Sequence, residues 1–168
     1  MLSGIKIIES VTNGDITICP FNKDNVNSVS YDMEIDNEII VYEKGTCLDT
    51  HKQCPGKKII IPEEGLTLIP GNLYLGKTKE RVCSNKFIPC VSGRSSFARL
   101  GIQVHQTAFF ANIGHDFNWV LEITATVPVT IHRGDKISQL YFEEVYGDNT
   151  ITYNGKYEKD NIKSFIPD

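Results

Sequence analysis

Short hydrophobic runs, many of them rich in Val, Ile, Tyr and Thr, recur along this chain between clusters of Gly, Pro, Asn and Asp. Runs of this kind are typical of β-strands, and a long series of them favours a barrel or a jelly-roll-like sandwich. The pattern predicts strands at 15–19, 30–35, 39–42, 58–61, 66–69, 73–77, 86–91, 101–104, 120–126, 129–131 and 138–143. We therefore expect a mainly β protein.

Helical periodicity is confined to the start of the chain. Residues 3–13 predict one short helix, with Ser3 as its N-cap, with Ile5, Ile8 and Val11 on one side, and with Asn13-Gly14 at its end. A single helical turn is also predicted at 94–100, with Ser95 as its cap. The rest of the chain carries no repeat or linker that would divide it, so we expect one domain spanning 1–168.

Composition narrows the class of protein. The formal net charge of −4 argues against non-specific binding to nucleic acid, which favours a basic surface. The first residues carry no secretory signal, and no apolar run reaches the roughly 18 residues of a membrane-spanning helix. We expect a soluble protein of the cytoplasm, with no membrane contact. Its five cysteines, an odd number, favour reduced thiols.

One group of residues in the sequence could form a metal site. Cys47, His51 and Cys54 lie close together in the sequence and could ligate zinc. A structural zinc site requires a fourth ligand, which no neighbouring residue supplies at a recognisable spacing. A surface loop is therefore favoured over a metal site.

The segment 92–100, SGRSSFARL, suits an anionic, phosphate-bearing ligand. Arg94 can form a bidentate pair with phosphate oxygens, and the hydroxyl groups of Ser95 and Ser96 add donors. Such short runs also occur in solvated turns, so the blocks around this one decide between the two interpretations.

Those blocks are GDITICPF at 14–21, SYDM at 30–33, LIPGNLYLGKTKERV at 68–82, GIQVHQTAFF at 101–110, NWVLEITATVP at 118–128 and IHRGDKISQLYFEE at 131–144. With them, the chain resembles the superfamily of deoxycytidine triphosphate deaminases and deoxyuridine triphosphatases (dUTPases), and is closer to the deaminase branch. The most specific feature is the spacing of 23 residues between Arg99 and Glu122. The resemblance implies a distorted β-barrel of the dUTPase type.

The resemblance implies a catalytic group. In similar deaminases, a glutamate at the position of Glu122 takes a proton from the water that attacks C4 of cytosine and then helps ammonia to leave. Ser95 and Arg99 support it. This chemistry uses no zinc, and the chain lacks the H-x-E and P-C-x-x-C motifs of the zinc deaminases. By pattern alone, Glu122 would be an exposed residue of a half-buried strand, and Arg99 a member of a surface ion pair.

Nucleotide-binding residues follow from the resemblance as well. It places Arg94, Ser96, Asn112, Gln139, Tyr153, Lys156 and Tyr157 around the substrate. Mg²⁺ accompanies the triphosphate, without ligands that we can assign in the chain, and family members are typically homotrimers with sites at subunit contacts. By pattern alone, Gln139 is an outward-facing strand residue, and the polar segment 147–168 is a disordered terminus. The resemblance instead predicts that a ligand orders this segment.

Two departures bear on the activity. Asn112 stands ten residues before Glu122, where many relatives carry an aspartate that activates water for attack on the α-phosphate. Because asparagine cannot accept a proton, we expect pyrophosphatase activity to be weak or absent. Phe117 stands where glycine is usual and adds bulk near the sugar and base.

The predicted function is hydrolytic deamination of dCTP to dUTP and ammonia in pyrimidine deoxynucleotide metabolism. One alternative is a dUTP pyrophosphatase or a bifunctional enzyme. Another is a catalytically silent regulatory trimer that binds dCTP or dTTP without turnover.

Overall fold

Strands dominate the part of the chain that the computed structural model describes, which comprises residues 1–52, 54–147, 151, 153 and 154. The strands are β1 (Ile16–Cys19), β2 (Tyr31–Met33), β3 (Ile35–Tyr42), β4 (Lys57–Ile60), β5 (Leu66–Leu68), β6 (Leu73–Ser84), β7 (Ile88–Gly93), β8 (Ile102–Gln103), β9 (Asp116–Ala125), β10 (Val129–Ile131) and β11 (Ser138–Glu143). The helical elements are α1 (Gly4–Thr12), the short α2 (Ser95–Ala98) and the 3-10 turn η1 (Lys23–Asn25). The predicted mainly β fold with a short N-terminal helix is confirmed.

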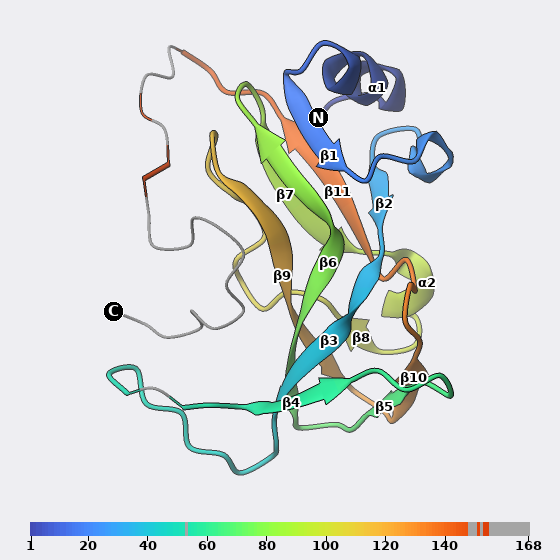
Figure 1. The fold of residues 1–168 in the computed structure, drawn as a ribbon, viewed down its shortest axis with the longest axis vertical. Helices are drawn as coiled ribbons and strands as arrows, with labels where there is room; N and C mark the ends of the chain where they lie inside the picture. The colour runs from blue at the N-terminus through green and yellow to red at the C-terminus, as the bar shows by residue number, and fades with distance from the viewer. Residues whose placement is uncertain (53, 148–150, 152, 155–168) are drawn as a thin grey trace.

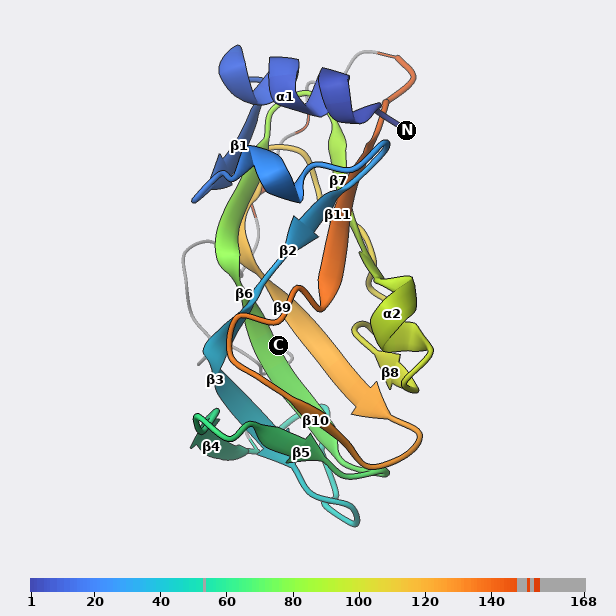
Figure 2. The ribbon, with the colours of Figure 1, turned by 90° about the vertical axis from the view of Figure 1, so that its right-hand side faces the viewer.

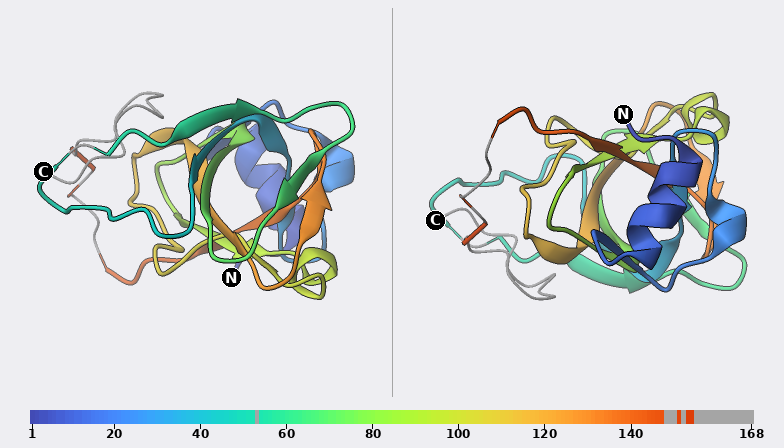
Figure 3. Two further views of the ribbon diagram at one scale, coloured as in Figure 1. Left: turned by 90° about the horizontal axis from the view of Figure 1, so that it is seen from below. Right: turned by 90° about the horizontal axis from the view of Figure 1, so that it is seen from above.

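Three antiparallel sheets surround the core (Figure 1). The largest has the order β4-β3-β6-β9-β8, with β1 paired to the far end of β6. The second has the order β2-β11-β7, and the third pairs β10 with β5. Viewed end-on, the sheets lie around one central region, with α1 across one end (Figure 3). Among the described strands, the pairing does not close into a single continuous barrel.

The core follows from alternation along the strands. In β9, Trp119, Leu121 and Ile123 are buried, and the residues between them are half-buried. In β11, Leu140 and Phe142 are fully buried in the same way. This period of two is what a strand with one face on the core requires.

Helix α1 begins and ends where the sequence predicts. The Ser3 hydroxyl accepts a hydrogen bond from the Lys6 amide at 3.3 Å, and Gly14 follows the C-cap with a φ of 81°. The predicted apolar side is wrong, because Gly4, Ile7 and Ser10 are buried while Ile5 is exposed. The cause is a close approach at Gly4, where a Cβ atom would lie 2.0 Å from the backbone oxygen of Asn27.

Three predicted strand boundaries are wrong by four residues or more. The strand predicted at 39–42 begins at Ile35, the strand predicted at 73–77 continues to Ser84, and the strand predicted at 120–126 begins at Asp116. In β6, Thr78 and Glu80 point inward and are buried, so polar residues occupy core positions and hide the alternation. The resulting pair of long strands, β6 and β9, runs along the length of the largest sheet (Figure 2).

Candidate active site

Glu122 lies on the outer face of β9. Its neighbours Leu121 and Ile123 point into the core, and Glu122 itself is half-buried. Its Oε2 atom accepts a hydrogen bond from the backbone N–H of Gln106 at 2.8 Å. Among the described residues, no hydrogen-bond donor contacts the other carboxylate oxygen. One oxygen is therefore held by the protein, and the second is available to a water or a ligand.

Gln106 fixes this glutamate further. Its side-chain amide donates to the backbone oxygen of Glu122 at 3.3 Å and to the hydroxyl of Thr124 at 3.4 Å. The backbone N–H of Glu122 donates to the Val104 oxygen at 3.0 Å. Segment 104–106 is thus bound along the outer edge of β9 beside Glu122.

The predicted supporting residues Ser95 and Arg99 lie at the first position and at the C-cap of α2. Both side chains are exposed, and the Arg99 amide donates to the Ser95 oxygen at 3.1 Å. The prediction that Ser95 caps this turn is wrong, because Arg94 occupies the N-cap and no side chain in the described part of the chain makes a capping hydrogen bond there. Ser96 is exposed on the same turn.

Gly101 connects α2 to β8 and lies beside the end of β9, where its backbone oxygen accepts a hydrogen bond from the Thr126 amide at 2.9 Å. Its φ is 83°, and a Cβ atom there would lie 2.1 Å from the hydroxyl oxygen of Thr126. Beyond it, β8 pairs with β9 through Gln103 and Thr124. Figure 2 shows α2 and β8 beside β9.

The fold therefore brings the elements of Glu122, Ser95 and Arg99 next to one another. Among the described residues, no hydrogen bond or ion pair joins Glu122 to Ser95 or Arg99.

A second polar group lies on the β2-β11-β7 sheet. The register places Gln139 of β11 between Asp32 of β2 and Ser92 of β7. Arg94 forms an ion pair with Asp32 at 2.9 Å and donates to the backbone oxygen of Lys136 at 2.8 Å. The Gln139 amide donates to the Gly93 oxygen at 3.1 Å. Arg94 and Gln139, both predicted to face the triphosphate, are thus brought to one site.

Asn112 lies at the other end of the β6–β9 pair. It is exposed in the turn before β9, where the Gly114 amide donates to Ser84 at the end of β6. Glu122 pairs with Leu75, near the start of β6. Glu122 lies six positions after Asp116 along β9, which corresponds to roughly 20 Å. Within one chain, the structure does not bring Asn112 beside Glu122.

An aromatic stack borders the Asn112 turn. The rings of His115 and Phe117 lie 4.1 Å apart, and Phe117 lies 5.0 Å from the buried Trp119. Phe117 pairs with Val82 on the core side of β9, the face opposite Glu122. Its bulk is therefore directed into the stack and the core of its own chain. Asp116 forms an ion pair with Arg81.

Tyr153 joins the same stack from the C-terminal segment. Its ring lies 4.1 Å from that of His115, and its amide donates to the Ile113 oxygen at 3.1 Å. Tyr153 is thus held at the Asn112 end of its own chain. The predicted contacts Lys156 and Tyr157, and most of the segment 147–168, lie outside the described residues.

Metal ligands do not gather in the described part of the chain, where no group of three His, Cys, Asp or Glu side chains could hold an ion. Cys47 and His51 are exposed in the loop before β4, and Cys54 is half-buried. None of the helices that the structure describes has the length and apolar character of a transmembrane helix.

Comparison with known proteins identifies the family. A family model described as dCTP deaminase-like matches residues 1–145. The chain belongs to the dCTP deaminase-like family. This confirms the family that the sequence blocks predict, and with it an enzyme of the deaminase type.

Several curated relatives of the dCTP deaminase-like family align along almost the whole chain. A protein of Clostridium acetobutylicum named "dCTP deaminase, dUMP-forming" is 42% identical over 167 residues, which cover 99% of this chain and 94% of the relative. One of Hathewaya histolytica with the same name is 43% identical over 158 residues, covering 94% of this chain and 91% of the relative.

A solved structure of the same family supports the fold. The 2'-deoxycytidine 5'-triphosphate deaminase of Agrobacterium tumefaciens superposes with a TM-score of 0.64 at 18% identity. The match covers 84% of this chain and 45% of that one, and at this identity it bears on the fold alone.

Sequence reasoning did not identify three polar residues of this region, namely Asp32, Gln106 and His105. Asp32 is buried and pairs with Arg94, and Gln106 holds Glu122. His105 has a buried Nδ1 atom without a hydrogen-bond partner in the described part of the chain. Each is one polar residue in a short strand or loop, so only the fold shows which residue it faces.

Proposed function

We propose that the protein hydrolyses the exocyclic C–N bond of dCTP, with Glu122 as the general base. The observation that carries this proposal is the state of the Glu122 carboxylate, which has one oxygen held at 2.8 Å by the Gln106 amide and the other without a donor among the described residues. A carboxylate fixed in this way can take a proton from a water molecule without first reorienting. Membership of the dCTP deaminase-like family indicates the substrate class.

The proposed reaction needs one water per dCTP. Glu122 accepts a proton from the water as its oxygen bonds to C4 of cytosine. The protonated Glu122 then delivers that proton to the amino group, the C4–N bond breaks, and ammonia leaves with the electron pair of that bond. The remaining proton of the C4 hydroxyl moves to N3, which gives the C4 carbonyl and the N3–H of uracil. Ser95 orients the water, and the guanidinium of Arg99 offsets the negative charge of the tetrahedral intermediate.

The triphosphate contacts are proposed on the resemblance and on the geometry of the β2-β11-β7 sheet. Gln139 lies in β11, Arg94 directly follows β7 and pairs with Asp32 of β2, and Ser96 lies in α2. Lys156, Tyr157 and Tyr153 are proposed as further contacts. Mg²⁺ enters with the nucleotide as part of the substrate.

The product of the proposed reaction is dUTP, because Asn112 cannot take a proton from a water that attacks the α-phosphate. Asp116 does not replace it, since its carboxylate pairs with Arg81. A second candidate is a bifunctional enzyme that also releases pyrophosphate and yields dUMP. It is favoured by the names of the relatives from Clostridium acetobutylicum and Hathewaya histolytica, which are dUMP-forming.

We also propose that the enzyme is a homotrimer with sites at subunit contacts. Glu122 and the Asn112 turn lie at opposite ends of β9, so a single chain does not place both beside one nucleotide. Contact between copies could bring the two ends together. Sedimentation equilibrium measures the assembly mass, and a monomer at micromolar concentration would contradict this proposal.

The test of the reaction is separation of products after incubation with dCTP and Mg²⁺, and in parallel with dUTP. We expect dUTP and ammonia from dCTP, and no change in dUTP. Release of dUMP and pyrophosphate would support the bifunctional candidate and refute our interpretation of Asn112. No product from either nucleotide, together with measurable dCTP binding, would indicate the silent regulatory trimer.

A further inference from the structure

The Arg94 guanidinium is held in place before any ligand binds. Its Nη2 atom lies 2.9 Å from the Oδ2 atom of Asp32, and its Nη1 atom donates to the Lys136 oxygen at 2.8 Å. The Asp32 side chain is 9% exposed, whereas the Arg94 side chain is 31% exposed. The Asp32 carboxylate is thus buried, and the Arg94 guanidinium is partly exposed to solvent.

Asp32 is itself fixed from its other side. Its Oδ1 atom accepts a hydrogen bond from the Asn27 side-chain amide at 2.9 Å. Because both carboxylate oxygens have a donor, Asp32 cannot rotate without losing a bond. The network runs from Asn27 through Asp32 to Arg94.

We propose that Asp32 is a positioning residue, which fixes the Arg94 guanidinium so that its remaining donors meet a phosphate group. This inference rests on the proposed function, which places Arg94 at the triphosphate. A guanidinium carries five N–H groups, and the contacts with Asp32 and Lys136 use one each, so within the described part of the chain three remain for a ligand. An arginine side chain that is already ordered loses less rotamer freedom when it binds.

Asp32 could also affect triphosphate affinity through its charge alone, and that effect would be opposite in direction to positioning. A carboxylate beside a phosphate-binding site repels the ligand, so its removal would strengthen triphosphate binding if charge alone mattered. Burial of Asp32 and its contact with Arg94 limit this repulsion, because the pair presents little net charge. The direction of change on neutralising Asp32 therefore separates positioning from charge.

The experiment uses Asp32→Asn, which keeps the size of the side chain and removes its charge. Calorimetry measures binding of inorganic tripolyphosphate and of dCTP, and steady-state assays measure KM and kcat for dCTP and for deoxycytidine. Glu38→Gln is the matched control, since it neutralises a carboxylate that pairs with Lys58 between β3 and β4, in a different sheet. Asn27→Ala is a milder second variant that removes only the hydrogen bond to Oδ1.

We expect Asp32→Asn to weaken tripolyphosphate binding and to raise the KM for dCTP, each about tenfold, the effect of one charge-assisted hydrogen bond. We expect kcat to stay within about twofold, the deoxycytidine KM to be unchanged, and Asn27→Ala to shift the dCTP KM in the same direction but less.

Unchanged or tighter tripolyphosphate binding would overturn the proposal, and so would equal losses for dCTP and deoxycytidine. If Asp32→Asn does not fold, Asn27→Ala decides in the same way. Absence of deamination in the wild-type protein would refute the proposed function, while the tripolyphosphate measurement would still test Asp32.

Discussion

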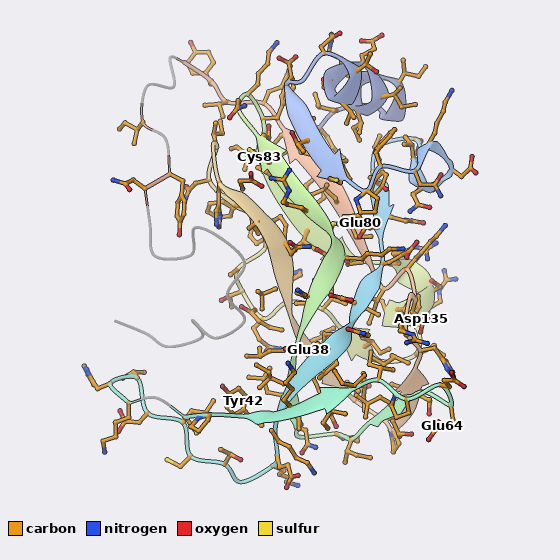
Figure 4. All side chains as sticks on the ribbon, viewed as in Figure 1. Glu38, Tyr42, Glu64, Glu80, Cys83 and Asp135 are labelled. Atoms are coloured by element: carbon orange, nitrogen blue, oxygen red, sulfur yellow. The ribbon has the colours of Figure 1, made fainter. Side chains whose placement is uncertain are left out.

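Glu80 is a buried acid that the proposed reaction does not use, and it makes the stability of the protein depend on pH. Its side chain lies in the middle of β6, toward β2, and is 2% exposed (Figure 4). Burial raises the pKa of Glu80 from 4.5 to about 7, against the smaller opposing effect of hydrogen bonds from the backbone amides of Glu80 and Glu34. The Glu34 amide donates to its Oε2 atom at 3.0 Å.

The direction in which stability changes with pH depends on whether the folded or the unfolded protein binds the proton more tightly. Between about pH 4.5 and 7 the folded protein keeps the Glu80 proton and the unfolded chain releases it. The contribution of Glu80 to the free energy of unfolding is therefore fully present below pH 4.5 and is lost as the pH rises to 7. Each pH unit in that interval removes about 1.4 kcal/mol, so the whole interval removes about 3 kcal/mol.

The perturbation is Glu80→Gln, which keeps the shape of the side chain and cannot ionise. Urea unfolding at fixed protein concentration, repeated from pH 5 to pH 8, gives the free energy of unfolding at each pH. We expect the wild-type protein to lose more stability than the variant across this range, by about 2 to 3 kcal/mol. Glu38→Gln, which neutralises a half-buried carboxylate paired with the exposed Lys58, should keep the wild-type slope. Parallel curves for wild type and Glu80→Gln would refute the buried, protonated state.

Three further predictions test separate parts of the structure. Asn112→Asp should introduce pyrophosphate release from dUTP, measured with a coupled phosphate assay; no release would show that residue 112 alone does not decide the product. Gly101→Ala should lower the free energy of unfolding by about 2 kcal/mol or more, because of its φ and the Thr126 contact, whereas Gly14→Ala, at a similar φ in open space, should cost about 1 kcal/mol; equal losses would contradict the contact. His115→Ala should accelerate hydrogen exchange of the Tyr153 amide about tenfold, and His115→Phe should not, since the ring stack holds Tyr153; equal exchange in both would refute the stack as an anchor.

The sequence predicts the strands well where hydrophobic and polar residues alternate. It fails in β6, because buried Thr78 and Glu80 look like surface residues in a pattern. Both side chains have hydrogen-bond partners that no sequence pattern contains. The Thr78 hydroxyl donates to the backbone oxygen of Glu80 at 2.8 Å and accepts from the Trp119 amide at 2.9 Å, and the Glu80 carboxyl accepts from the Glu34 amide at 3.0 Å. Polar core positions of this kind can be found only once the neighbouring strands are known.

Part of the candidate site could likewise be predicted from the sequence, and part becomes visible only in the structure. The SGRSSFARL block and its distance from Glu122 identify the family and the residues to examine. The partners Asp32 and Gln106 come from distant or irregular segments, so their roles depend on the pairing of β2 with β11 and on the segment bound beside β9. The separation of Asn112 from Glu122 is likewise a consequence of strand length.

Glu122 as the base of dCTP deamination is tested most directly by Glu122→Gln, assayed for ammonia release from dCTP and for dCTP affinity by calorimetry. The variant keeps the size of the side chain and the contact with the Gln106 amide, but it cannot accept a proton. We predict that kcat falls by at least about a thousandfold while the dissociation constant of dCTP stays within severalfold. Turnover close to that of the wild-type enzyme would contradict the account.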